Sequence, residues 1–212
     1  MKIEVIDSKG KSTGRSVELP EEVFGIEPND HAIYLAVKQY LAHQRQGTSC
    51  AKERNAVAGS RRKIKKQKGT GTARFGNITN PLFRGGGRVF GPEPRSYGGK
   101  LNKKVKSLAR ASVFSQKVKN DEIKVIEDLS FDTPKTKDFV ALLDALGCSG
   151  QKTLLITNQS DNNIALSARN VQKTEVSPAN AVSIYDIINA NTVLLSEGAI
   201  AQLTGAAEEV AA

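Results

Sequence analysis

The stretch from residue 47 to residue 99 limits most strongly what this chain can fold into. No hydrophobic period holds there for more than a few residues, because Gly, Pro and Asn interrupt each run that could form a helix or a strand. Structureless connections longer than about 12–15 residues are uncommon inside compact domains and usually serve a function. We therefore predict a globular domain built from residues 1–46 and 101–212, with residues 47–100 inserted in it as a long extended loop.

Positive charge gathers in the same part of the sequence. Residues 45–110 contain eighteen Lys or Arg and two acids, a local charge of +16, whereas the rest of the chain carries −7. Eleven of the 18 glycines also lie in residues 45–110. Glycine beside basic side chains disfavours a packed core and permits close approach to a polyanion. This pattern predicts a nucleic acid as the partner.

The flanks of this stretch alternate between strand and helix patterns. Strands separated by helices indicate parallel pairing, with the crossovers covering the sheet. We therefore expect an α/β fold, a three-layer α/β/α sandwich with a mainly parallel sheet, and a frayed end at 206–212. The predicted strands are at residues 3–7, 16–19, 122–127, 153–157, 173–176 and 192–195, and the predicted helices are at 30–44, from 102, from 133 to 147, 162–168, 183–189 and from 197.

Two of these helices have a predicted buried face. Ile33, Val37 and Leu41 recur at helical spacing in the first. The helix opened by Thr133 and Pro134 has a hydroxyl cap and a proline at its first position. Its predicted face consists of Phe139, Leu142, Leu143 and Leu146.

The sequence favours no enzyme. Gly69 and Gly71 are followed by Arg74 where a dinucleotide-binding loop requires glycine, and the Gly99-Lys100 pair is followed by Leu101 where a phosphate loop requires Ser or Thr. The chain has two histidines and two cysteines without a metal-site spacing, and its apolar runs are shorter than the roughly 18–20 residues of a membrane span. We expect no catalytic site, metal, cofactor, small-molecule substrate or membrane, and we expect a cytoplasmic protein.

Single aromatic residues recur every seven or eight positions within the basic stretch, at Phe75, Phe83, Phe90 and Tyr97. Two interpretations stay open for them: local packing of the loop, or stacking on nucleic-acid bases. Two interpretations also stay open for the glycine run 85–87. It suits close approach of the backbone to phosphates, and a flexible hinge explains it almost as well.

Three linked motifs give the chain a specific resemblance. They are Lys68-Gly-Thr-Gly71-x-Ala73-Arg74, Gly85-Gly-Gly87-Arg88-Val-Phe90-Gly-Pro92-x-Pro94-Arg95-x-Tyr97 and Leu101-Asn-Lys-Lys104, preceded by Arg45-Gln-Gly-Thr48. In order and spacing they resemble the bacterial members of the large-subunit ribosomal protein four family, over nearly the whole chain.

The resemblance implies a structural constituent of the large ribosomal subunit. Such a protein binds large-subunit rRNA, supports early assembly, and places its loop tip, residues 61–74, beside the nascent-peptide exit tunnel and the neighbouring ribosomal proteins there. It is not an enzyme or a homo-oligomer. The predicted rRNA-binding residues are Arg45, Lys52, Arg54, Arg61, Arg62, Lys63, Lys65, Lys66, Lys68, Arg74, Phe75, Phe83, Arg84, Gly85, Gly86, Gly87, Arg88, Phe90, Arg95, Tyr97, Lys100, Asn102, Lys103 and Lys104.

Two other classes of protein share part of this pattern. A general nucleic-acid-binding or DNA-compacting protein would carry a basic arm, but it would typically dimerise and would not need the linked motifs. An α/β enzyme with a basic lid would need a catalytic group at a strand end, and none stands out in the sequence.

Overall fold

The computed structural model describes residues 1–211, and it describes side chains up to residue 204. The predicted fraying at 206–212 concerns residues outside that side-chain description. Contacts divide the chain into two units. Met1–Leu41 with Lys100–Ala212 is called the α/β unit here, and Ala42–Gly99 is called the basic unit.

The α/β unit contains a single sheet of six strands within residues 1–211, in the order β2-β1-β3-β6-β4-β5. Strands β1 and β2 form an antiparallel hairpin, and the other neighbouring pairs are parallel. The strands are β1 (Lys2–Ile6), β2 (Ser12–Glu18), β3 (Ile123–Ile126), β4 (Thr153–Thr157), β5 (Thr174–Pro178) and β6 (Thr192–Ser196).

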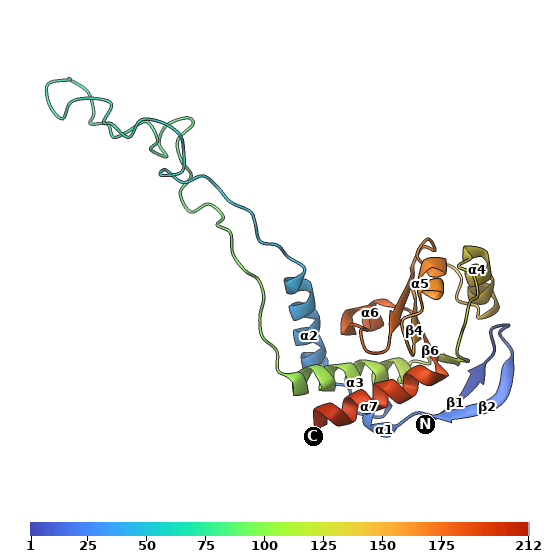
Figure 1. Ribbon diagram of the computed structural model, residues 1–212. Helices are drawn as coiled ribbons and strands as arrows, with labels where there is room; N and C mark the ends of the chain where they lie inside the picture. Colours follow the sequence, from blue (N-terminus) through green and yellow to red (C-terminus); the bar gives the residue numbers. More distant parts are fainter. Residues whose placement is uncertain (212) are drawn as a thin grey trace. The chain divides into compact units, whose positions relative to one another are not determined.

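Helices cover both faces of this sheet (Figure 1). One face packs against α1 (Glu21–Phe24), α3 (Lys103–Lys119), α6 (Ile184–Asn189) and α7 (Glu197–Ala211). The other face packs against α4 (Thr136–Ala145) and α5 (Asn162–Ala168). Helix α2 (Asp30–His43) packs through alanines against α3. The predicted three-layer α/β/α sandwich with a mainly parallel sheet is therefore confirmed.

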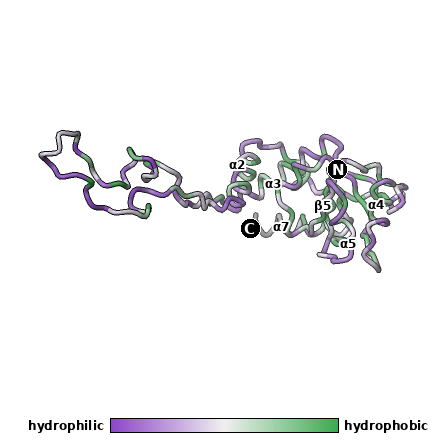
Figure 2. Tube along the Cα trace, turned by 90° about the horizontal axis from the view of Figure 1, so that it is seen from above, coloured by the Kyte–Doolittle hydropathy of each residue, from purple (hydrophilic) through white to green (hydrophobic). Residues whose placement is uncertain are grey.

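The central strands are apolar throughout because both of their faces are buried. On β6, Val193 and Leu195 point into the core that contains α3 and α7, and Leu194 points into the core that contains α4 and α5. All three side chains are 0 % exposed. Such continuous apolar runs are typical of parallel strands with helices on both sides. Figure 2 shows the hydrophobic residues gathered in the α/β unit, whereas the tube of residues 42–99 is mostly hydrophilic or neutral.

Three local expectations were wrong. Helix α4 begins at Thr136, because Lys135 is extended and occupies the N-cap, so Thr133 and Pro134 lie in the connection before the helix. The short helix α1 was not expected. In α2 the buried side chains are Ala32 and Ala36 instead of the larger apolar residues, since small side chains allow α2 close against Ala109 of α3.

Candidate nucleic-acid interface

Beyond the end of α2 at His43, the basic unit has a defined backbone although it has no helix or strand. Its outgoing and returning halves are joined by hydrogen bonds from Arg95 N to Gly47 O (3.0 Å), from Ala51 N to Pro92 O (2.9 Å) and from Arg88 N to Lys52 O (2.9 Å). A further bond, from Ile64 N to Gly76 O (3.1 Å), closes the tip. The segment is therefore a doubled chain whose halves are paired at intervals, which sequence periodicity could not predict.

Between the pairings at Gly76 and Arg88, residues 77–87 fold into successive turns. Asn80 N, Phe83 N and Gly86 N each donate to the carbonyl oxygen three residues earlier, and Gly87 N then returns to Thr79 O (3.0 Å). Asn77 Nδ2 donates to Thr79 Oγ1 (2.8 Å), and these two polar side chains are 8 % and 2 % exposed. The turns form a small polar core within the basic unit.

Two glycines of the 85–87 run are required by close backbone contacts, Gly86 with these turns and Gly87 with the outgoing half of the chain. A Cβ on Gly86 would lie 2.1 Å from Asn80 O, and a Cβ on Gly87 would lie 2.2 Å from Arg54 N. Both are backbone atoms, so a side chain at either position would force the chain apart. Gly86 and Gly87 thus serve close approach of protein backbone to protein backbone. Gly85 has open space around it.

The four aromatic residues divide between the two interpretations of the sequence. Phe75 and Phe83 stack on each other with ring centroids 5.9 Å apart, and Lys65 Nζ lies 4.7 Å from the Phe75 centroid. Tyr97 is covered by two guanidinium groups, those of Arg45 at 3.8 Å and Arg95 at 4.6 Å. Phe90 is 102 % exposed and has a positive φ of 54°, so it packs against nothing in the basic unit.

The two arginines also change the chemistry of Tyr97. Hydrogen bonding from Arg95 lowers the pKa of the Tyr97 hydroxyl below its ordinary value of 10.0, and the positive charges of Arg45 and Arg95 lower it further. The cause is that both arginines favour the negatively charged tyrosinate. Arg45 and Arg95 therefore place two positive charges beside the Tyr97 ring, at the ends of the doubled chain.

The basic side chains of this unit are directed to solvent. All the predicted Lys and Arg contacts between residues 45 and 95 are exposed except the half-buried Lys65. Among the described residues, every ion pair lies in the α/β unit and none involves these side chains. Arg61 donates to Asn55 O (2.9 Å), Lys65 donates to Thr72 Oγ1 (3.0 Å), and Lys63 bonds to Gln67. Their positive charge is therefore not neutralised within the protein.

The remaining predicted contacts lie in the α/β unit, at the start of α3. Lys100, Asn102, Lys103 and Lys104 are exposed there. Asn102 occupies the N-cap without a side-chain cap bond, and the first turn has no acid. Free amide hydrogens and lysines at a helix start favour an anion. Arg110, further along α3, is not exposed like these residues. It donates a hydrogen bond to Val182 O (3.4 Å), and its burial lowers its pKa.

Four exposed apolar side chains of the basic unit were missed by the sequence reasoning. Ile64 is 47 % exposed, Ile78 54 %, Leu82 88 % and Val89 56 %. Isolated apolar residues between turns carry no periodic signal, so only their exposure identifies them as contact candidates. Among the described residues, no group of His, Cys, Asp and Glu could hold a metal ion, and no helix is long and apolar enough to cross a membrane.

Comparison with known proteins gives the family to which the chain is similar. Residues 17–206 match the model of the ribosomal protein L4/L1 family. The large ribosomal subunit protein uL4 of Christiangramia forsetii is 57% identical over 200 residues, which is 94% of this chain and 96% of that protein. The uL4 proteins of Flavobacterium johnsoniae and Cytophaga hutchinsonii are 55% and 50% identical over similar lengths.

The chain belongs to the ribosomal protein L4/L1 family. This is a family of ribosomal components and not of enzymes, as the sequence reasoning predicted. The predicted contact residues were not tested by these comparisons, and they stay a prediction.

Proposed function

We propose that this protein is a structural constituent of the large ribosomal subunit in the cytoplasm and that it binds large-subunit rRNA through the basic unit and the start of α3. One observation carries the proposal: the exposed Lys and Arg side chains of residues 45–95 form no ion pair among the described residues. Phosphates are the anions that would neutralise them, with release of counterions from the RNA. Membership of the ribosomal protein L4/L1 family supports large-subunit rRNA as the RNA that is bound.

The paired backbone of the basic unit supports a division of roles among its residues. Side chains that point to solvent, such as Arg62, Lys66 and Lys68, contact phosphates, while Phe90 stacks on an unpaired base. Phe75 and Phe83 instead keep the tip in shape. The unit thus presents charge on a partly formed scaffold, which reduces the ordering cost of binding.

We further propose that the tip, residues 61–74, reaches the wall of the nascent-peptide exit tunnel and that the protein joins the subunit early in assembly. The support is the resemblance of the loop motifs to the family, together with the closed tip bonded from Ile64 N to Gly76 O. Replacing Lys65 and Lys66 by Glu should leave the protein in purified large subunits and alter nascent-chain stalling. Normal stalling at full occupancy would remove the tip from the tunnel wall.

Salt dependence of RNA binding tests the main proposal. A variant with Arg62, Lys66 and Lys68 changed to Gln should bind large-subunit rRNA with a shallower slope of log K against log salt, by about 0.7–0.9 per lost phosphate contact. A control variant has Lys9, Lys11 and Lys137 changed to Gln, which are exposed lysines of the α/β unit. Equal slopes for both variants would contradict the proposal. Equal affinity for rRNA and for DNA of the same length would favour a general nucleic-acid-binding protein.

A further inference from the structure

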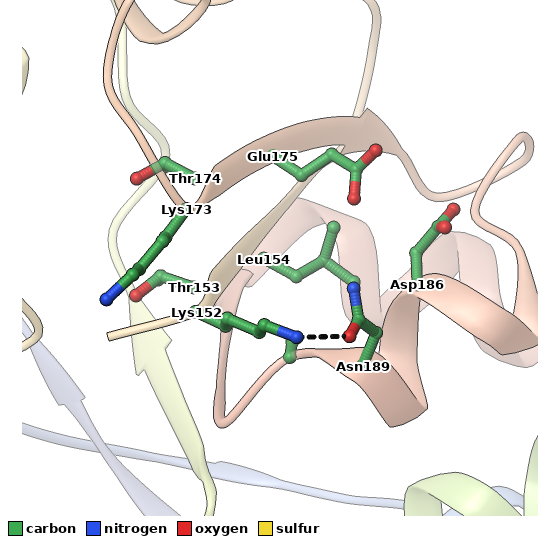
Figure 3. Close-up of a pocket in the computed structure, with 9 residues that line it drawn as sticks. Lys152, Thr153, Leu154, Lys173, Thr174, Glu175, Asp186 and Asn189 are labelled. Atoms are coloured by element: carbon green, nitrogen blue, oxygen red, sulfur yellow. Dashed lines mark hydrogen bonds between the residues drawn. The ribbon is translucent and has the colours of Figure 1, made fainter. Parts of the chain in front are cut away.

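A cavity of about 210 Å³ opens in the α/β unit at the amino ends of β4 and β5, beside α6 (Figure 3). Its floor is apolar, since Leu154 and Ala190 line it and are 1 % and 6 % exposed. Two carboxylates line the cavity, those of Glu175 on β5 and Asp186 on α6, and Figure 3 shows both directed to the same side. The cavity combines an apolar base with a negatively charged side.

The two lysines of the cavity do not neutralise these carboxylates. Lys152 Nζ donates to Asn189 Oδ1 (2.7 Å), and Lys173 Nζ donates to Gly150 O (3.1 Å). Figure 3 shows the Lys173 side chain running away from Glu175. No ion pair among the described residues involves Glu175 or Asp186.

The two carboxylates, Glu175 and Asp186, therefore repel each other electrostatically. Partial burial raises the pKa of Glu175, and the negative charge of Asp186 raises it further. A cation placed between them would remove that repulsion. The only other charged groups that line the cavity from its elements are Lys152 and Lys173, whose bonds are described above.

We propose that this cavity receives a single basic side chain, an arginine or a lysine, from a neighbouring protein. The aliphatic stem would lie on Leu154 and Ala190, and the charged head would reach Glu175 and Asp186. The volume is below the roughly 300–1,000 Å³ of small-molecule sites, and it suits one inserted side chain. Only the identification of the partner as a ribosomal neighbour rests on the proposed function.

The negative charge of Glu175 and Asp186 favours a basic protein over RNA as the occupant of the cavity. Two lysines and two acids line the cavity, but both lysines are bonded elsewhere, so Glu175 and Asp186 form a negatively charged side. An RNA phosphate approaching Glu175 and Asp186 would be repelled, whereas a basic protein would be attracted. A planar guanidinium can donate to two carboxylates at once, which makes arginine the better occupant of the two.

Titration of the full-length protein with N-acetyl-arginine amide tests the cavity directly. Amide resonances of Leu154, Glu175 and Asp186 should shift together in NMR spectra, with a Kd on the order of 1–10 mM for one side chain. The neutral analogue N-acetyl-citrulline amide should leave them unchanged. Glu175→Gln or Asp186→Asn should weaken arginine binding about fivefold or more, and Glu27→Gln, an exposed acid of the same unit, should have no effect. Shifts of equal size with citrulline, or no shifts, would overturn the proposal.

Two further measurements identify the source of the cation. Spermidine that shifts the same resonances at lower concentration than arginine would assign the cavity to a free organic cation and overturn a protein partner. In purified large subunits, a photo-crosslinking p-benzoylphenylalanine in place of Thr174 should join to an Arg- or Lys-containing peptide of another protein. Crosslinks to RNA alone, or none, would contradict the proposal. If the protein binds arginine but does not enter large subunits, the proposal of a cavity for a basic side chain is retained. The proposed ribosomal function is then contradicted.

Discussion

Side-chain burial organises the α/β unit, whereas backbone hydrogen bonds and stacked rings organise the basic unit. Val5, Val125 and Leu155 are 0 % exposed in the first. Within Ala42–Gly99 the buried residues are Asn77, Thr79 and Gly87, and none of them is a large apolar residue. Because apolar burial is the dominant favourable term in folding, the two units should differ widely in stability. A basic unit of this kind can adapt to a rigid partner at low cost.

The largest expected effect is a charge placed in the core of the α/β unit. Leu143→Asp should unfold that unit, because an unpaired buried carboxylate costs several kcal/mol and typical domains are stable by about 5–15 kcal/mol. Leu143 is 3 % exposed, whereas Val140 on the same helix is 39 % exposed and provides the control Val140→Asp. Thermal unfolding followed by circular dichroism measures both. Unchanged melting of the Leu143 variant would show that α4 is not packed as described.

A methyl group added to the basic unit should act locally. Gly87→Ala places a Cβ against Arg54 N and should break the Gly87–Thr79 and Arg88–Lys52 backbone bonds, at about 1–3 kcal/mol of local stability. Faster trypsin cleavage within residues 52–95, with unchanged melting of the α/β unit, is the expected result. Gly76→Ala is the control, since its Cβ would meet only Asn80 Nδ2 at 3.7 Å. A lowered melting temperature would show that the two units are energetically coupled.

The aromatic residues should separate packing from RNA contact. Phe83→Leu removes the stack on Phe75 and should cost about 0.5–1.5 kcal/mol within the free protein, visible as a changed chemical shift of the Phe75 ring. Phe90→Leu should leave the free protein unchanged and weaken rRNA binding by about 1–3 kcal/mol, if Phe90 stacks on a base as proposed. Equal effects of both changes on both measurements would refute the division between them.

The smallest effect concerns the titration of Tyr97. Arg95→Gln removes the main group that favours the tyrosinate, so the pKa of Tyr97 should rise toward its ordinary value of 10.0. NMR titration of a ring-labelled tyrosine resolves this residue from the other three. Arg84→Gln, which changes an exposed arginine elsewhere in the basic unit, should leave the pKa unaltered. No change with Arg95→Gln would mean that the two side chains are not in contact in solution.

Sequence reasoning succeeded where burial follows a period. The apolar runs of β4 and β6 and the Phe139–Leu143 face of α4 predicted the sheet and one of its layers, because burial of both faces leaves a pattern in the residues themselves. It failed for α2, whose buried Ala32 and Ala36 are recognised only from the neighbouring helix. Close helix packing selects small residues, which a search for large apolar side chains overlooks.

The candidate site was predictable in composition and not in geometry. The charge and the motifs indicated nucleic-acid binding. The need for glycine at positions 86 and 87, however, comes from backbone contacts with Asn80 in the same turns and with Arg54 on the opposite half of the chain. Pairing between residues such as Lys52 and Arg88 has no local signature. For the same reason the sequence could not decide which aromatic residues pack and which are exposed.

The position of β6 has a consequence for the order in which the protein forms during synthesis. This strand lies between β3 and β4 in the sheet, yet it is the last to leave the ribosome that makes it. The basic unit ends at Gly99, almost a hundred residues earlier. At about 5–20 residues per second, the nascent chain carries its most basic segment for roughly 5–20 s before the central strand exists to complete the sheet. During that interval the basic unit is attached to an α/β unit that is not yet folded. Binding to unrelated polyanions at this stage is therefore a risk that follows from the strand order.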